Sequence, residues 1–205
     1  MGRTPRSPFA AGRAEVRRVV ARAGLLGLAA LLGTACTLGA NPSAITSLPS
    51  PASTTGYLTY INSSFGFRIK YPPDWSPQAG SAGTAIAFVS PAQGSSDSFR
   101  ENVNVLIEDL ADPSMSLGQY TDTSLRQAKT AIDAFRLLRS GPATLASRSA
   151  ERVIYLGQIG RDLKFESVWL VEKGRAYVVT YTATPDAFAG TAPTAEAVIG
   201  SFELG

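Results

Sequence analysis

The chain has 205 residues, enough for one ordinary domain with appendages, and it contains no histidine and one cysteine. These counts exclude Ser-His-Asp and Cys-His catalysis, an HExxH zinc site, an internal disulfide and a CxxC motif. The hydrophobic fraction of 44% and the charged fraction of 17% are typical of a globular protein.

The positive charge of the chain is concentrated at its N-terminus. Of the 19 Lys+Arg and 16 Asp+Glu, six arginines but only one glutamate lie in the first 22 residues. The rest of the chain therefore carries 13 basic and 15 acidic side chains, and no run of basic residues follows Arg22. Recognition of a phosphate backbone needs clustered Lys and Arg, so we expect no nucleic-acid binding.

Residues 1–35 have the pattern of a signal peptide. A basic stretch precedes the apolar, leucine-rich segment Ala23–Ala35, and the small residues Gly33-Thr34-Ala35 lead directly into Cys36, the only cysteine. This boundary resembles the lipobox of bacterial lipoproteins, although Gly33 stands where leucine is usual. We therefore expect cleavage before Cys36 and attachment of a diacylglycerol to its thiol, which would anchor the protein in the membrane.

Two alternatives to lipidation remain open. Residues 23–40 are uncharged and nearly long enough to cross a bilayer, so the leader could stay as an uncleaved single span. The leader could also be an ordinary secretory signal with an incidental thiol. In all three cases the rest of the chain faces outside the cytoplasm.

Residues 36–56 are predicted to combine the lipidated cysteine with a flexible linker. The segment 37–56 contains three prolines among small and polar residues, with no charge and few apolar side chains to bury. Twenty residues of flexible coil span on the order of 25 Å, which would hold a domain clear of a membrane surface.

Residues 57–205 are predicted to form one α+β domain. Residues 65–71 alternate apolar and polar side chains and stop at Pro72-Pro73, as a half-buried strand does. Shorter apolar patterns predict strands at 84–89 and 103–107. A helix is expected over 117–134, beginning with a capping box between Ser116 and Gln119.

The second half of the domain is predicted to be rich in β-structure. Strands are expected at 135–139, 151–159, 163–172 and 175–183, the last two joined by a hairpin in which Gly174 adopts a positive φ. A short helix is expected to begin at Pro193. Strands joined by short turns predict a mostly antiparallel sheet with helices packed on its faces.

The segment 66–75, GFRIKYPPDW, resembles the opening signature of the PsbP-like proteins. Later segments resemble the same family: Glu101–Val105, Leu117–Tyr120, Lys173–Tyr177 and Ile199–Phe202. The resemblance covers about residues 57–204 and implies the Mog1/PsbP fold, an α-β-α sandwich around an antiparallel sheet. It also suggests either an extrinsic photosystem II subunit or one of the related bacterial lipoproteins. Metal sites of some plant members use histidine, which this chain lacks, so no metal site is carried over.

Two features of the domain are candidate sites. Glu108, Asp109 and Asp112 could supply the hard oxygen ligands that Ca²⁺ prefers, although a solvated acidic loop would have the same sequence. Trp75 could be an exposed platform for a partner protein, or it could cover the sheet edge as part of the core. There is no phosphate-binding or GxSxG motif, so we expect neither a cofactor nor a catalytic residue.

These observations predict a non-catalytic binding domain tethered to the membrane outside the cytoplasm. Its partner would be a membrane protein complex or a small ligand. The alternatives are a protein like the photosystem II extrinsic subunits, or a carboxylate- or metal-dependent hydrolase that uses the acidic residues of the 108–112 segment.

Overall fold

The computed structural model describes residues 53–80, 83–95 and 97–205. The predicted signal peptide, Cys36 and most of the predicted linker lie outside the described residues. The elements in chain order are β1 (Leu58–Asn62), β2 (Phe67–Tyr71), β3 (Ser76–Ala79), β4 (Thr84–Val89), β5 (Asn102–Asp109), α2 (Leu117–Ala131), β6 (Asp133–Leu145), β7 (Arg148–Gln158), β8 (Asp162–Glu172), β9 (Arg175–Ala183), α3 (Phe188–Gly200) and β10 (Glu203–Leu204).

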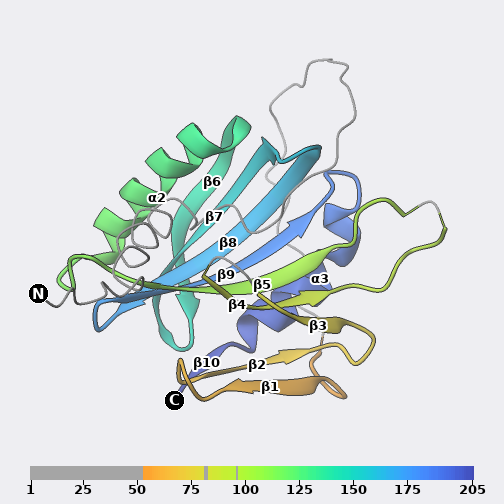
Figure 1. The fold of residues 1–205 in the computed structure, drawn as a ribbon, viewed down its shortest axis with the longest axis horizontal. Coiled ribbons are helices and arrows are strands. Elements are labelled where there is room, and N and C mark those ends of the chain that lie inside the picture. Colours follow the sequence, from red (N-terminus) through yellow and green to blue (C-terminus); the bar gives the residue numbers. More distant parts are fainter. Residues whose placement is uncertain (1–52, 81–82, 96) are drawn as a thin grey trace, which may run out of the picture.

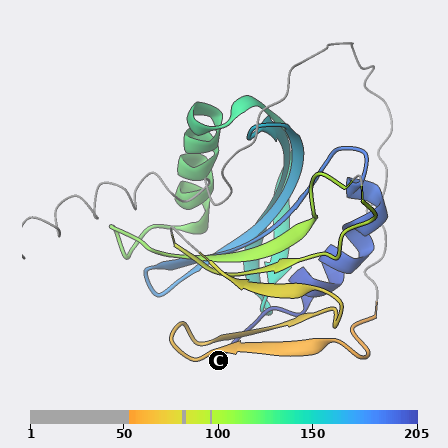
Figure 2. The ribbon, with the colours of Figure 1, turned by 45° about the vertical axis from the view of Figure 1, so that its right-hand side comes forward.

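A seven-stranded antiparallel sheet, in the order β3-β4-β5-β9-β8-β7-β6, forms the centre of the domain (Figure 1). Helix α2 packs against β6, β7 and β8 on one face, and α3 packs against β5 and β9 on the other. Figure 2 shows the curved sheet between the two helices, with β1 and β2 in a separate layer below it. The predicted α+β sandwich is confirmed. The small sheet β1-β2-β10 was not predicted.

Each face of the large sheet has its own hydrophobic core. On β8, Phe165 and Trp169 belong to the cluster under α2, whereas Val168 and Leu170 belong to the cluster under α3. The strand expected over 163–172 is therefore confirmed, and both of its faces are buried. Trp169 also donates a hydrogen bond from its Nε1 to Thr121 Oγ1 at 2.9 Å, which ties β8 to α2.

Helix α2 begins where the sequence predicts but ends three residues early. The capping box is present, with Gln119 N donating to Ser116 Oγ at 3.3 Å and Ser116 N donating to Gln119 Oε1 at 2.9 Å. Ile132, directly before β6, has an extended backbone. Its side chain is only 3% exposed because it packs against Gly157 of β7. The residues after Ala131, which also fitted the helical pattern, therefore join β6 and pair with β7 from Asp133 onward.

Strand β6 has 13 residues, much longer than the predicted 135–139. It includes Gly141 and Pro142, which sequence rules treat as strand breakers. Because β6 is an edge strand, one side of its backbone needs no ladder partner, and a proline that lacks an N–H is tolerated there.

The predicted start of the last helix at Pro193 is wrong. Helix α3 begins at Phe188 and contains Pro193 in its interior. A proline there removes one backbone hydrogen bond. Burial of the helix compensates for that loss, and its buried apolar side chains are Phe188, Ala192, Ala195, Ala197, Val198 and Ile199.

The predicted hairpin between β8 and β9 is confirmed, and Gly174 has φ +75°. A Cβ added at Gly174 would lie 3.0 Å from Pro113 Cβ. Gly174→Val should therefore lower the free energy of unfolding by about 1–3 kcal/mol in urea denaturation. The control is Gly141→Val, since Gly141 is a half-buried edge-strand glycine with nothing near its Cβ position. Equal losses in the two variants would contradict the role of Gly174.

Candidate functional site

The acidic residues at the end of β5 do not form the predicted cation site. Glu108 Oε2 accepts a hydrogen bond from the Tyr120 hydroxyl at 3.0 Å. Asp109, the next residue, accepts one from Arg175 Nε at 2.7 Å. Neighbouring residues of a strand point to opposite faces, so these two carboxylates cannot converge on one ion.

Asp112 is also engaged locally. Its Oδ1 accepts hydrogen bonds from the backbone N–H and the hydroxyl of Ser114, at 2.9 and 2.6 Å, and these bonds lower the pKa of Asp112. Nowhere in the described part of the chain do three His, Cys, Asp or Glu side chains gather as metal ligands. The described structure therefore does not gather these three carboxylates into a cation site, and each of them already has a protein partner.

Trp75 is not an exposed platform for a partner. It is 5% exposed and belongs to the core cluster on the α3 face of the sheet. Its backbone N–H donates to Pro72 O at 3.0 Å, so the turn after β2 directs the indole inward. The interpretation of Trp75 as a partner surface is wrong, and its alternative role in the core is correct.

The best candidate site is a groove on the α2 face of the sheet, at the end that α2 does not cover. Helix α2 lies over β6–β8, and the groove of about 510 Å³ lies over β3, β4 and β5. The groove is lined by residues of these three strands and of the loops that join them. They are Gln78, Ala79, Gly80, Thr84, Ala87, Val89, Asp97, Ser98, Phe99, Arg100, Asn102 and Asn104.

The groove has a floor of neutral hydrogen-bonding side chains. Asn102 and Asn104 of β5 point into it because the residues that alternate with them, Val103 and Val105, fill the core on the opposite face. The Asn102 side chain makes one hydrogen bond, from Nδ2 to Arg100 O at 3.4 Å. Across the described residues, the Asn104 side chain makes none. The floor thus keeps donors and acceptors for a ligand.

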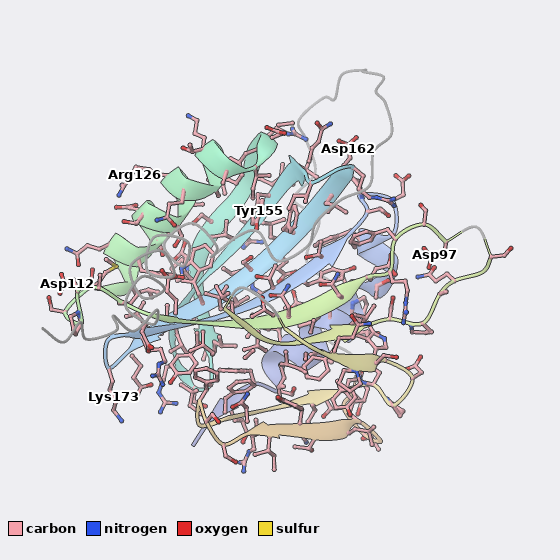
Figure 3. All side chains as sticks on the ribbon, viewed as in Figure 1. Asp97, Asp112, Arg126, Tyr155, Asp162 and Lys173 are labelled. Atoms are coloured by element: carbon pink, nitrogen blue, oxygen red, sulfur yellow. The ribbon has the colours of Figure 1, made fainter. Side chains whose placement is uncertain are left out.

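The loop before β5 forms the rim of the groove, and Figure 3 marks its position by Asp97. Asp97 accepts hydrogen bonds from the backbone N–H groups of Gln93 and Phe99, at 2.9 and 3.1 Å, and these bonds lower its pKa. Arg161 lies 5.5 Å from the centre of the Phe99 ring and donates to Ser98 Oγ at 3.0 Å. The rim is therefore held in place by several independent contacts.

Arg100 supplies a positive charge to the groove. Its Nε donates to the carbonyl oxygen of Ser90, which orients the plane of the guanidinium. The terminal nitrogens of Arg100 form no hydrogen bond or ion pair with any other described residue. The groove therefore combines an oriented cation, with donors to spare, and an uncharged polar floor.

A second polar feature lies buried beneath α3. Arg152 of β7 pairs with Glu166 of β8 and with Glu196 of α3. Glu166 is completely buried and its Oε2 has no hydrogen-bond partner in the described structure. Burial, followed by the nearby Glu196 carboxyl, raises the pKa of Glu166 to about 8. These side chains join α3 to the sheet.

No protein-family model matches the chain, and no curated protein matches its sequence. Solved structures do match. The solution structure of cyanobacterial PsbP (CyanoP) from Synechocystis sp. PCC 6803 superposes with a TM-score of 0.55 at 13% identity, covering 78% of this chain and 99% of CyanoP. The chain has a PsbP-like fold. The protein of unknown function PA94 from Pseudomonas aeruginosa gives a TM-score of 0.52 at 17% identity, over 71% of this chain and 94% of PA94.

The resemblance to PsbP-like proteins inferred from the segment 66–75 is therefore confirmed for the fold. At these identities the likeness carries no information about ligands, and the function of this PsbP-like domain must be argued from its own side chains. Within the described residues, no helix has both the length and the apolar character needed to cross a membrane.

Sequence reasoning missed both polar features of the PsbP-like domain. The groove had a weak signal, because Asn102 and Asn104 alternate with valines and so place two carboxamides on one face of a strand. Glu166 had a clearer signal, since an acid in a strand that is apolar on both faces has to be buried. Its partners Arg152 and Glu196 could not be identified from sequence spacing.

Proposed function

We propose that the protein is a lipoprotein held on the outer side of the cell membrane by Cys36, and that its PsbP-like domain is a non-catalytic binding domain. The observation that carries the proposal is the order of segments in the sequence. A basic and then apolar leader ends in small residues at the only cysteine, and an uncharged linker connects it to a domain whose first strand begins at Leu58.

The binding role is supported by the groove over β3–β5. It offers Arg100 and a floor of carboxamides whose hydrogen-bonding capacity is not used within the described residues. The absence of histidine from the sequence, and of a second cysteine, argues against the common nucleophile–base pairs. The proposed function is therefore recognition of a ligand or partner close to the membrane surface, within reach of the flexible linker.

Cys36→Ala should move the protein from the membrane fraction to the soluble exported fraction, because the lipid has no other attachment point. Cell fractionation with immunoblotting measures this, and mass spectrometry of the mature N-terminal peptide detects the diacylglycerol. Thr37→Ala, which keeps the thiol, is the control and should stay in the membrane. Retention of Cys36→Ala in the membrane would contradict lipidation and favour an uncleaved span.

A specific surface also supports a second candidate, an accessory subunit of a membrane protein complex. Strand β6 is an open sheet edge, and it carries Leu137 and Leu138, each 43% exposed. An unpaired edge with exposed apolar side chains is a surface to which another protein can bind.

In-cell crosslinking with mass spectrometry tests this second candidate and would identify a photosystem if one is the partner. One complex in near-stoichiometric yield, lost in Leu137→Lys, would support it. Leu58→Lys on β1 is the matched control, since Leu58 is 46% exposed but lies in the other sheet. Recovery of the protein alone would favour a small ligand.

A further inference from the structure

We propose that the groove over β3–β5 binds an acidic sugar, with the ligand carboxylate on Arg100 and its hydroxyl groups on the carboxamides of the floor. This inference rests on the proposed binding function and adds the chemical class of the ligand. The groove has a volume of about 510 Å³, which falls within the usual size of small-ligand sites, about 300–1,000 Å³.

Arg100 is built to receive a carboxylate. The bond from its Nε to Ser90 O fixes the guanidinium plane, while both terminal nitrogens remain without a partner among the described residues. Two parallel N–H groups in one plane match the two oxygens of a carboxylate, and such bidentate contacts are stronger than neutral hydrogen bonds. Since the group is already oriented, little rotamer freedom is lost when a ligand binds.

The charge around the groove also favours an anion. Arg100 and Asp97 line the groove, and Arg161 contacts Phe99 and Ser98 of its rim. Both oxygens of Asp97 already accept backbone hydrogen bonds. Glu101 accepts hydrogen bonds from Ser90 and Gln93 and is 2% exposed, so it is buried away from the groove. Both of these acids are therefore engaged by protein donors, whereas the terminal nitrogens of Arg100 have no partner among the described residues, so Arg100 is the charge of this site that a ligand can meet.

The floor favours hydroxyl groups over a peptide backbone. The main-chain groups of β4 and β5 are used in pairing with β3, with each other and with β9, so a peptide cannot add to them as a strand. The part of the floor formed by β4 and β5 therefore meets a ligand through side chains. Asn102, Asn104 and Gln78 each carry both a donor and an acceptor, as do the hydroxyl groups of a sugar.

The test compares two disaccharides that differ at one group. Cellobiouronic acid carries a carboxylate where cellobiose carries a hydroxymethyl group. Binding to the full-length protein is measured by saturation-transfer NMR and calorimetry in a polyoxyethylene detergent, which contains no sugar. We expect the acid to bind about tenfold more tightly than cellobiose, and higher salt to reduce the difference.

Variants at Arg100 and Asn104 test the assignment of each group. Arg100→Gln should lower the affinity for the acid to that for cellobiose. Asn104→Asp, which places a negative charge in the floor at nearly unchanged shape, should also weaken binding of the acid. Arg126→Gln is the control, since Arg126 lies on α2, far from Asp97 in Figure 3, and bonds to Thr123 on its own helix. Melting temperatures confirm that the variants are folded.

Several outcomes would overturn the inference. Equal affinity for the two sugars, or an unchanged affinity in Arg100→Gln, would refute the carboxylate contact. Failure of both sugars to bind would refute the ligand class. Neither result bears on the membrane anchor, which Cys36→Ala tests separately. Conversely, membrane retention of Cys36→Ala would refute the lipid anchor even where the sugar binds.

Discussion

Replacing Arg152 with methionine should lower the free energy of unfolding by about 3–5 kcal/mol near pH 8. Arg152 is the partner of Glu166, which is fully buried, and of Glu196, which is 8% exposed. Removing the guanidinium leaves two buried carboxyl groups side by side without a counter-ion, and their desolvation is then uncompensated. The loss should be smaller near pH 5, where a carboxyl group can be neutralised by a proton.

Urea denaturation of the two proteins at both pH values measures the effect. Arg148→Met is the matched control: Arg148 pairs with Glu172, but its side chain is 39% exposed, so its loss should cost at most about 1 kcal/mol. Adding Glu196→Gln to Arg152→Met should restore part of the stability, because one of the unpaired charges is removed. If Arg152→Met costs no more than Arg148→Met, the cluster does not hold α3 to the sheet.

The sequence predicts the parts of the fold in which local pattern and long-range packing agree. In a strand, Phe165 and Trp169 must lie on one face of the sheet and Val168 on the other, and in this domain both faces are buried. The Ser116 capping box and the positive φ of Gly174 are local devices that need no tertiary information. These features are correctly placed for that reason.

The sequence fails where tertiary contacts override a local rule. Pro142 lies inside a strand because β6 is at an edge, and Pro193 lies inside a helix because α3 is buried. The turn between β6 and β7 uses Ala146 and Ser147 at φ +51° and +60°, and neither residue type signals such a conformation. Strand β10 has two residues and exists only because it pairs with β2.

The candidate site follows the same logic. Glu108, Asp109 and Asp112 are close in sequence, but the pleat of β5 and a local turn separate their carboxylates. The groove is assembled from β3, β4 and the loop before β5, so its composition depends on strand pairing. Proximity along the chain is thus a poor guide to proximity in an antiparallel sheet, where register decides which side chains meet.

The free energy of unfolding of the unmodified protein should fall as the pH rises from about 5 to about 8, by on the order of 3 kcal/mol. Burial and the neighbouring Glu196 carboxyl raise the pKa of Glu166 to about 8 in the folded state, from an ordinary value of 4.5. Between these two values the folded protein keeps a proton that the unfolded chain releases. Rising pH therefore favours the unfolded chain, and the loss is complete above the folded pKa.

The composition of the chain makes this slope easy to assign. There is no histidine to titrate in the same range. The lowered pKa values of Asp97 and Asp112 act in the opposite direction and at lower pH, where stability falls as the pH drops below their ordinary value of 3.8. Urea denaturation at half-unit steps of pH measures the slope. Glu166→Gln, which keeps the shape but carries no titratable proton, should remove it, and a slope that persists in this variant would show that the buried carboxyl pair is not its source.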